Sequence, residues 1–410
     1  MQAGIVIIGA GHGGVQLAAS LREAKYNGPI TLISAEADIP YHKPPLSKSF
    51  MQTTDTPLQL LRGADFFADK AIDLRLGRRV NYIDRDKQTV WLDNNTSVEY
   101  AHLVLATGMR PRPLNIPGAT LEQVYYLRTA ADAHQLRSGL PDSGHAVIIG
   151  GGFIGLEAAA MLAARGLQVT VIEVAERLLA RAVSPTTATA VADYLQDSGV
   201  QIHCGSAVTA LHGKAGQLTH AELNTGEQLE ADIVIAGIGG LPEDQLARDA
   251  GLETDNGIMV DQYLTTSDPM ISALGDCVSF PHSSDQRLLR LESVQNATDQ
   301  ARALALTLNG QATPYDTLPW FWSDMGRLKL QISGLAEAVD EDIIVRRDDG
   351  TLQSVWRLQN GNPVAVETLN SPGEHMLSRR LMAEGIILDK ALMAAGDVSL
   401  LKAAYRKLRT

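Results

Sequence analysis

The chain contains the same short pattern twice: an apolar run that breaks into glycines and resumes as an Ala/Leu-rich stretch. The first copy is "GIVIIGAGHGGVQLAASL" from residue 4, and the second is "HAVIIGGGFIGLEAAAML" from residue 145. A further apolar run follows each copy, "ITLIS" after the first and "VTVIE" after the second. Short Val/Ile runs that alternate with helix-forming stretches are typical of parallel strands joined by helices. We therefore expect two α/β modules, each built on a parallel sheet.

The glycines of both copies have the G-x-G-x-x-G spacing. They are Gly9, Gly11 and Gly14 in the first copy, and Gly150, Gly152 and Gly155 in the second. The first glycine of such a loop permits a tight turn, the second lets a pyrophosphate approach the backbone, and the third lets helix and strand pack closely. Free N–H groups at the helix N-terminus then face the phosphates. Each loop is expected to bind a dinucleotide, and the alternative is an incidental glycine-rich turn.

An acidic residue follows the second strand of each module, Glu36 in the first and Glu173 in the second. A carboxylate at this place accepts hydrogen bonds from ribose hydroxyls and repels a 2′-phosphate, which favours NADH over NADPH at Glu173. Arg177 and Arg181 lie just downstream and could pair with that phosphate, so NADPH stays the alternative. Two dinucleotide sites in one chain predict a tightly held FAD and an exchanging nicotinamide, with hydride passing between their rings.

Further apolar runs extend both modules. "LVLATG" at 103–108 and "DIVIAGIG" at 232–239 each predict a strand that ends at a glycine, and "MISALGDC" at 270–277 predicts another buried strand. After about residue 315, the runs "LKLQISGL", "DIIVRR", "SVWRLQ" and "PVAVETL" predict antiparallel strands. "QNGN" at 359–362 predicts a two-residue hairpin turn, and the final "VSLLKAAYRKLRT" predicts a basic amphipathic helix. We expect an FAD-binding domain at 1–111 and 244–316, an NAD-binding domain at 112–243, and a C-terminal α+β domain at 317–410.

Composition excludes several classes of protein. The net charge of −12 over 410 residues argues against nucleic acid as a partner, and no apolar run approaches the roughly 18 residues that span a membrane. The N-terminus enters a strand pattern almost at once, so no signal peptide is expected, and two cysteines suit a reducing cytoplasm. Cys204 and Cys277 lie in strand-like segments and are interpreted as buried structural thiols. The segment from Glu36 to Lys48 contains no cysteine, so a thiol relay is not expected, and neither is a metal site.

Several longer motifs have the order found in one family. They are "PPLSK" at 44–48, "ATGMRPRPL" at 106–114, "YLRTAADA" at 126–133, "TSDPMISALGDC" at 266–277, "RLESVQNATDQA" at 290–301 and "PWFWSD" at 319–324. With the two glycine loops, this set resembles the FAD-dependent NADH:ferredoxin and rubredoxin reductases, a family that includes putidaredoxin reductase and the reductase components of aromatic-ring dioxygenases. The resemblance covers essentially the whole chain.

The resemblance implies a fold and an activity. The fold is α/β, with two Rossmann-like dinucleotide-binding domains of the glutathione-reductase-like FAD/NAD type and a C-terminal α+β domain. The activity is transfer of electrons from NADH through FAD to a [2Fe-2S] ferredoxin that serves a P450 or Rieske oxygenase, with rubredoxin as the less expected acceptor. A monomer or weak dimer in the cytoplasm is expected. The alternatives are an NADH oxidase that uses oxygen directly and an NADH-sensing flavoprotein; a membrane quinone reductase is a weaker option.

The resemblance also implies residues that bind the cofactors. On the FAD side they are Gly9, Gly11, His12, Gly13, Gly14, Glu36, Lys48, Val80, Ala106, Thr107, Gly108, Arg128, Asp276, Val294 and Trp320. On the NAD side they are Gly150, Gly152, Phe153, Ile154, Gly155, Glu157, Glu173, Arg181 and Gly239. An aromatic ring at Phe153 would shield the flavin until nicotinamide displaces it, or it simply packs under the loop.

Lys48 and Glu157 are the expected catalytic pair. The resemblance places Lys48 near flavin N5, held by an ion pair with Glu157, and a buried lysine needs such a partner because an unpaired buried charge is costly. The alternative is a solvated loop lysine.

Trp320 and Trp322 are expected beside the flavin and toward the iron–sulfur partner, unless they are ordinary core residues, and Arg302 matches a partner-facing position. Further candidates for a basic docking patch are Arg287, Arg290, Arg379, Arg380, Lys402, Arg406, Lys407 and Arg409.

Overall fold

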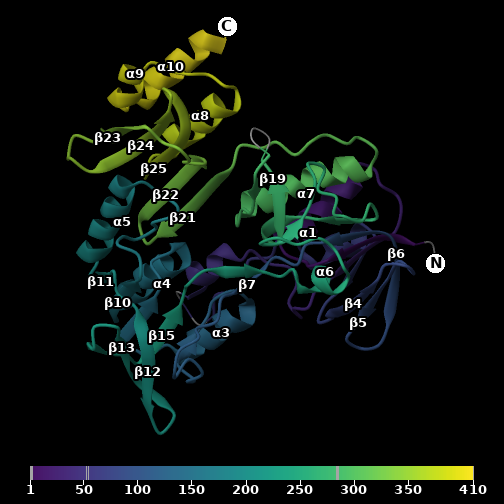
Figure 1. Cartoon of the computed structure of the whole chain (residues 1–410), viewed down its shortest axis with the longest axis horizontal. Helices are drawn as coiled ribbons and strands as arrows, with labels where there is room; N and C mark the ends of the chain where they lie inside the picture. The colour runs from purple at the N-terminus through teal and green to yellow at the C-terminus, as the bar shows by residue number, and fades with distance from the viewer. Residues whose placement is uncertain (1–2, 52, 54, 283–285, 410) are drawn as a thin grey trace. The chain divides into compact units, whose positions relative to one another are not determined.

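The computed structural model describes residues 3–51, 53, 55–282 and 286–409. It contains two compact units, each assembled from separate stretches of chain (Figure 1). The first unit comprises Met1–Lys43, Leu58–Arg110 and Gly240–Thr317, and the second comprises Pro44–Pro57, Pro111–Gly239 and Leu318–Thr410. None of the described helices is long and apolar enough to cross a bilayer.

The first unit is built on a sheet with strand order β3-β2-β1-β6-β5-β4, in which β18 pairs with β6. Its parallel strands are β1 (Gly4–Ile8), β2 (Ile30–Ile33), β3 (Ile72–Arg75), β6 (Ser97–Leu105) and β18 (Ile271–Ala273). The remaining two, β4 (Val80–Asp84) and β5 (Thr89–Leu92), are antiparallel. The parallel sheet and the buried strand within 270–277 were predicted; the antiparallel β4–β5 hairpin was not.

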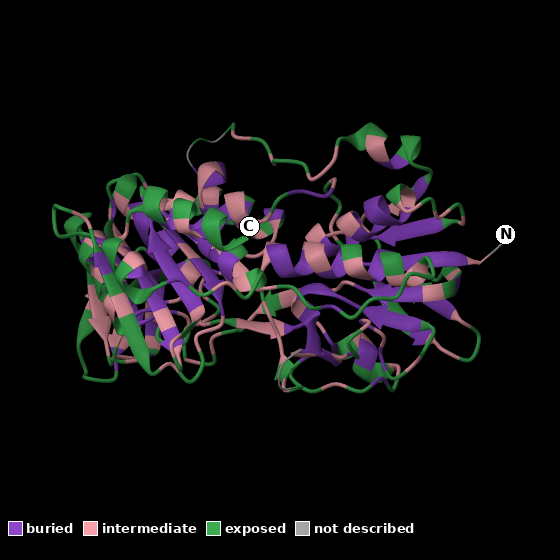
Figure 2. Cartoon of the chain, turned by 90° about the horizontal axis from the view of Figure 1, so that it is seen from above, coloured by how far each residue is buried: buried purple, intermediate pink, exposed green. Residues whose placement is uncertain are grey.

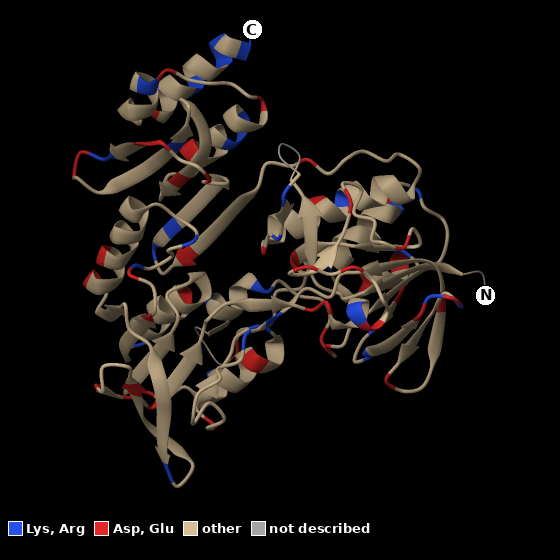
Figure 3. Cartoon of the chain, in the orientation of Figure 1, with Lys and Arg blue, Asp and Glu red and all other residues tan. Residues whose placement is uncertain are grey.

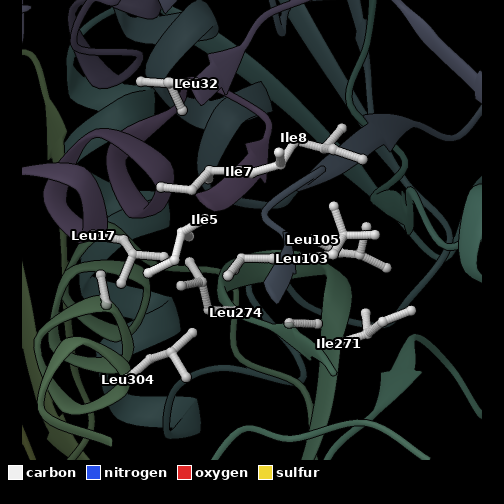
Figure 4. Packing of buried hydrophobic residues seen from close by; sticks show 14 of the residues in the cluster. Ile5, Ile7, Ile8, Leu17, Leu32, Leu103, Leu105, Ile271, Leu274 and Leu304 are labelled. Carbon is white, nitrogen blue, oxygen red and sulfur yellow. The ribbon is translucent and has the colours of Figure 1, made fainter. Parts of the chain in front are cut away.

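Two helices pack on each other in this unit, α1 (His12–Glu23) and α7 (Val294–Leu308). Every residue of β1 is buried, since a parallel strand in the middle of a sheet is covered on both faces. Figure 4 shows the core that results, with side chains from the strands, from both helices and from the residue after β18: Ile5, Ile7, Leu17, Leu103, Leu105, Ile271, Leu274 and Leu304. Burial of each such side chain stabilises the fold by about 1.5–3 kcal/mol.

The second unit contains a five-stranded parallel sheet of order β11-β10-β9-β15-β8. Its strands are β8 (Val124–Tyr125), β9 (His145–Ile149), β10 (Gln168–Glu173), β11 (Val200–Cys204) and β15 (Ile233–Ala236). Its helices are α3 (Ala130–Gly139), α4 (Phe153–Ala164) and α5 (Pro185–Asp197). Three antiparallel strands that the sequence did not predict form a separate sheet: β12 (Val208–Lys214), β13 (Gln217–Leu223) and β14 (Gln228–Glu230).

The C-terminal part of the second unit is an antiparallel sheet of order β21-β22-β25-β24-β23 with three helices. The strands are β21 (Trp320–Met325), β22 (Leu328–Gly334), β23 (Glu341–Arg346), β24 (Leu352–Gln359) and β25 (Asn362–Leu369). The helices are α8 (Pro372–Ala383), α9 (Lys390–Ala395) and α10 (Val398–Arg409). The four predicted strands and the final helix are present, and β21 is an addition. The hairpin turn is also confirmed, with φ of 51° at Asn360 and 79° at Gly361.

Shorter elements connect these layers. They are η1 (Pro44–Ser47), η2 (Ser49–Met51), α2 (Ala64–Asp69), β7 (Met109–Pro111), β16 (Gly240–Pro242), α6 (Gln245–Asp249), β17 (Ile258–Met259), η3 (Gly275–Cys277), β19 (Val278–Pro281) and β20 (Leu288–Leu289). Figure 2 shows that buried residues concentrate in the strands of the sheets and on the helix faces that cover them.

The expectation for the two cysteines needs a correction. Cys277 is fully buried but lies in the short helix η3 rather than in a strand, because the chain turns after β18. Cys204 does end a strand, β11, yet it is only half-buried, since it sits at the last position of that strand. Burial raises the pKa of both thiols, so both are held in the unreactive neutral form.

Candidate active site

The first glycine loop joins β1 to α1, and its geometry admits only glycine at two positions. Gly9 has a φ of +109°, and a Cβ there would lie 2.1 Å from the carbonyl oxygen of Ala106. A Cβ on Gly14 would lie 1.9 Å from the carbonyl oxygen of Gly9. At Gly11 a Cβ would meet nothing within 4 Å, and no described side chain caps the helix that follows. Backbone atoms therefore fill the space beside Gly9 and Gly14, whereas the space beside Gly11, at the N-terminus of α1, is free. A free helix N-terminus of this kind fits a pyrophosphate.

Other parts of the first unit meet at this loop. A Cβ on Gly13 would lie 2.4 Å from Leu274, just before η3, and 3.6 Å from the Cβ of Ala297 in α7. The structure thus brings the first-loop glycines together with the segments that contain Asp276 and Val294, and Gly9 lies against Ala106. Thr107 donates a hydrogen bond of 2.6 Å to the carbonyl oxygen of Glu243, and Gly108 has a φ of +72°. Val80 opens β4 and is buried opposite Leu92.

Glu36 has partners that the sequence analysis missed. Its carboxylate accepts a hydrogen bond of 2.9 Å from the ammonium of Lys43 and another from the hydroxyl of Tyr41. His42, between these two residues in the chain, lies 3.3 Å from His12 in a contact between the two imidazoles. Burial lowers the pKa of His42, and the nearby Arg62 lowers it further, which favours the neutral ring. The segment after Glu36 therefore folds back over the loop through side chains of residues 41–43.

The second glycine loop, between β9 and α4, repeats the geometry of the first. Gly150 has a φ of +109°, and its Cβ would lie 2.4 Å from the carbonyl oxygen of Gly237. A Cβ on Gly155 would lie 2.2 Å from the carbonyl oxygen of Gly150, whereas one on Gly152 would meet only the oxygen of Gly237, at 4.0 Å. The N-terminus of α4 is thus as open as that of α1. Gly239, where β15 has ended, has a φ of +97°, and its carbonyl accepts a hydrogen bond of 3.0 Å from the N–H of Arg112.

Glu173 lies at the edge of the second loop. One oxygen of its carboxylate accepts a hydrogen bond of 2.6 Å from the N–H of Gly151, and the other accepts one of 2.8 Å from the N–H of Ala175. The guanidinium of Arg177 donates a bond of 2.8 Å to the carbonyl of Ala180, while Arg181 is exposed. The backbone therefore orients the carboxylate at the loop, and Arg177 helps to fold the segment that follows.

The first turn of α4 carries Phe153 and Ile154. The ring of Phe153 lies 4.4 Å from that of Phe321 in β21, with 43° between the planes, and Ile154 is 47% exposed. The ring of Phe153 therefore packs against β21, and both its place under the loop and its role toward the flavin stay predictions.

A cluster of charged and hydroxyl side chains surrounds Lys48 in the second unit. Its ammonium nitrogen lies 3.0 Å from Oε1 of Glu157 and 3.7 Å from Oδ2 of Asp324. Glu157, in the second turn of α4, is 6% exposed and accepts hydrogen bonds of 2.6 Å from Ser47 and 2.7 Å from Ser323. The expected ion pair is present. The serines and Asp324 were missed, although they stand next to Lys48 and Trp322 in motifs that the sequence analysis used.

The two tryptophans of β21 lie on the same strand face, with ring centroids 5.4 Å apart. The guanidinium of Arg379 sits 4.1 Å from the centre of the Trp320 ring, a cation–π contact. The ring of His375 lies 5.6 Å from that of Trp320, and burial, with a smaller contribution from Arg379, lowers the pKa of His375 to about 4. Residues of α8 thus contact Trp320, which is half-buried, and Trp322 has ring contacts with Trp320 and Phe321.

The remaining candidates are placed as follows. Arg128 precedes α3, and its N–H donates a hydrogen bond of 3.1 Å to Asp132. Arg302 is exposed on α7 and pairs with Asp299 at 2.6 Å. Arg290, a candidate for the docking patch, is only 12% exposed and pairs with Glu292 at 2.7 Å, and its part in docking stays a prediction. Figure 3 shows basic residues along α10, in agreement with the predicted basic helix.

Comparison with known protein families gives two matches that together span most of the chain. The model described as "Pyridine nucleotide-disulphide oxidoreductase" matches residues 3–301, and the one described as "Reductase C-terminal" matches residues 320–404. The chain belongs to the pyridine nucleotide-disulphide oxidoreductase family. As an oxidoreductase of this family it uses FAD and NADH, and the open N-termini of α1 and α4 fit the two dinucleotides.

Individual relatives match over nearly their whole length. Rhodocoxin reductase of Rhodococcus erythropolis is 41% identical over 98% of this chain and 94% of its own. Putidaredoxin reductase CamA of Pseudomonas putida is 38% identical over 97% and 95%. Among solved structures, the ferredoxin reductase for the CYP199A2 system from Rhodopseudomonas palustris matches with a TM-score of 0.94 and 42% identity, over 98% of this chain and 100% of that one. These matches confirm the predicted fold class and the predicted resemblance.

Proposed function

We propose that this oxidoreductase is a ferredoxin reductase that passes electrons from NADH through FAD to a [2Fe-2S] ferredoxin, which in turn serves a P450 or Rieske oxygenase. The observation that carries the proposal is the full-length similarity to rhodocoxin reductase and putidaredoxin reductase. A solved structure of the covalent putidaredoxin reductase–putidaredoxin complex also matches, with a TM-score of 0.92 and 36% identity over 98% of this chain. Rubredoxin-NAD(+) reductase of Pseudomonas putida is 37% identical over 90% of the chain, so rubredoxin is the second acceptor to test.

The family's name refers to disulphide reduction, and this chain lacks the cysteines for that reaction. A disulphide reductase needs two neighbouring cysteines to relay electrons. Here Cys204 and Cys277 are both free, and the segment after Glu36 that leads to Lys48 contains no cysteine. Direct transfer from the flavin to the acceptor is the route that remains.

The bound flavin supplies hydride acceptance and one-electron donation, and the protein supplies binding, alignment and electrostatics. We propose that backbone N–H groups at the N-terminus of α1 hold the FAD pyrophosphate, while Glu36 accepts from the ribose and Asp276 from the ribityl chain. The ammonium of Lys48, paired with Glu157, acts on the flavin ring near N5. A positive charge there stabilises the electron-rich reduced ring.

On the nicotinamide side, we propose that the N-terminus of α4 binds the NADH pyrophosphate and that Glu173 accepts hydrogen bonds from the adenosine ribose. Two backbone N–H groups already fix the Glu173 carboxylate, so its negative charge stands where the 2′-phosphate of NADPH would lie. The preference for NADH follows from this repulsion. Phe153 and Ile154 are proposed to contact the nicotinamide end.

For the electron acceptor, we propose a path through Trp320 and Trp322, with Arg302 as a docking residue. The chain has a net charge of −12, so attraction to an acidic ferredoxin must come from a local basic patch. We further propose the domain division and the remaining site residues given above, a monomer or weak dimer, and a cytoplasmic location, which two free thiols fit.

The test is a two-step rapid-mixing experiment. The purified flavoprotein is first mixed with NADH without oxygen, and the loss of flavin absorbance is recorded. The reduced protein is then mixed with a [2Fe-2S] ferredoxin, with rubredoxin or with oxygen. Reoxidation that is fastest with the ferredoxin supports the proposal. Fastest reoxidation by oxygen identifies an oxidase, and slow reoxidation by all three identifies an NADH-sensing protein.

A further inference from the structure

The ammonium of Lys48 stands between two carboxylates of different surroundings. Glu157 is the nearer one, at 3.0 Å, and is 6% exposed; Asp324 lies at 3.7 Å, and its side chain is 36% exposed. An ammonium that moved from the first to the second would stay paired but would lie nearer to solvent, where water screens its charge. The position of this charge therefore depends on what holds Glu157 in place.

Two buried hydroxyl groups hold the Glu157 carboxylate, one at each oxygen. Ser47 donates to Oε2 at 2.6 Å and Ser323 donates to Oε1 at 2.7 Å. Ser47 is 3% exposed and Ser323 is 0% exposed. Ser47 also lies 3.4 Å from the carbonyl of Pro44, but its single hydroxyl proton serves the shorter contact. Hydrogen bonds to a carboxylate are among the stronger ones in proteins, so the two serines fix the orientation of the Glu157 side chain.

Each serine sits on an element that leaves its hydroxyl little freedom. Ser47 ends η1, whose first two residues are prolines, and both η1 and β21 pack against α4, the helix of Glu157. Ser323 alternates along β21 with Trp322 and Asp324, so it points to the opposite face of the strand from those two side chains. The hydroxyl groups therefore reach Glu157 and not Asp324.

We propose that Ser47 and Ser323 are positioning residues, which by fixing Glu157 keep the Lys48 ammonium at the buried carboxylate instead of at Asp324. This inference rests on the proposed function, in which that ammonium acts on the flavin. Its consequence is that the serines set the rate of flavin reduction and the flavin midpoint potential without touching either cofactor. A misplacement of about 1 Å at a reacting centre can cost up to roughly a hundredfold in rate, so a loss of about tenfold is expected when these residues are removed.

The test uses Ser47→Ala, Ser323→Ala and the double variant in the FAD-loaded protein. We expect the rate of flavin reduction at saturating NADH to fall about tenfold in the double variant, with the half-saturating NADH concentration within twofold of wild type. A tenfold loss in the equilibrium constant for reduction corresponds to a midpoint potential about 30 mV more negative for a two-electron couple. Adding Asp324→Asn to the double variant removes the competing partner and should recover most of the lost rate.

Ser354→Ala is the matched control. It deletes the same kind of bond, a buried serine donating at 2.6 Å to a buried carboxylate, that of Glu374 in the C-terminal sheet and helix α8. It should leave the flavin rate and potential unchanged. Ser47→Cys and Ser323→Cys leave no cavity and replace the hydroxyl by a slightly larger, weakly donating thiol, so they report on the hydrogen bond if the alanine variants fold poorly.

Crystal structures of the variants give a readout independent of turnover. We expect the Lys48 ammonium nearer to Asp324 than to Glu157 in the double variant. Wild-type rate and potential in every serine variant, with Lys48 still at Glu157, would overturn the proposal. If NADH fails to reduce even the wild-type flavin, the proposed function fails, and the position of Lys48 in the variants still decides the positioning role.

Discussion

The carboxylate of Glu173 accepts a hydrogen bond of 2.6 Å from the N–H of Gly151, in the middle of the second glycine loop. The acid that ends β10 is therefore tied to the backbone that is proposed to receive the pyrophosphate. This hydrogen bond fixes the position of the carboxylate that is proposed to bind the ribose of NADH. The preference for NADH over NADPH can therefore be tested by replacing Glu173.

We expect Glu173→Ser to raise the ratio of kcat/KM for NADPH to that for NADH by about tenfold, because the negative charge that repels a 2′-phosphate is lost. Steady-state kinetics with both coenzymes measures this. Glu176→Ser, at a nearby exposed acid, serves as the control and should leave the ratio unchanged. A wild-type preference for NADPH would contradict the role proposed for Glu173.

Lys48→Met should slow flavin reduction by about tenfold or more, since the charge that favours the reduced ring is removed. Single-turnover reduction by NADH without oxygen gives the rate. The control is Lys87→Met, at a lysine whose side chain is 77% exposed and pairs with Asp84. A change of less than about twofold for Lys48→Met would make it the solvated lysine of the alternative interpretation.

In the first glycine loop, folding requires Gly14, whereas FAD binding is expected to require Gly11. At Gly14 an added Cβ would lie 1.9 Å from a backbone oxygen, so Gly14→Ala should destabilise the fold by several kcal/mol, of the order known for overpacking. At Gly11 nothing lies within 4 Å, so Gly11→Ala should fold normally and bind FAD weakly, because the methyl group occupies the phosphate position. Thermal unfolding and flavin content distinguish the two. Tight FAD binding by Gly11→Ala would show that the pyrophosphate lies elsewhere.

Trp322→Ala should slow electron transfer to a [2Fe-2S] ferredoxin by about tenfold while flavin reduction by NADH stays within twofold, because only the second step uses the proposed path. Rapid mixing of the reduced protein with ferredoxin gives the rate. Trp91→Ala, at a tryptophan of β5 that is 42% exposed, is the matched control. Unchanged transfer in Trp322→Ala would remove this residue from the path.

The stability of the C-terminal part should depend on His375. Burial lowers its pKa to about 4, below the value of roughly 6.5 expected in the unfolded chain. The unfolded state therefore takes up the proton first as pH falls, so this contribution to stability is complete above about pH 6.5 and is lost as pH falls toward 4. His375→Gln should reduce the drop in unfolding free energy between pH 7 and pH 4.5 by about 2 kcal/mol, measured by urea unfolding. The exposed His134→Gln should leave the drop as it is in the wild type.

Local sequence was sufficient for the parts of this protein that depend on local geometry. Four of the six loop glycines have the structural role that the spacing predicted: Gly9 and Gly150 have positive φ, and a Cβ on Gly14 or Gly155 would collide with backbone oxygen. The parallel modules followed from alternating apolar strands and helices, and the final hairpin from Asn360 and Gly361. Strand β21 and the β12–β14 sheet were missed because tryptophan-rich or polar strands without strict alternation carry no clear period.

Only the tertiary structure determined which side chains contact each charged group. Ser47 and Ser323 stand 110 and 166 residues from Glu157 in the chain, and only the packing of η1 and β21 on α4 brings them to its carboxylate. The same holds for Arg379 on Trp320, 59 residues apart in the chain. Spacing in sequence determines the geometry of a turn or strand, because neighbouring residues share one backbone. A buried charged group needs hydrogen-bonding or ionic partners. Because these partners can come from distant parts of the chain, only the three-dimensional packing determines which residues they are.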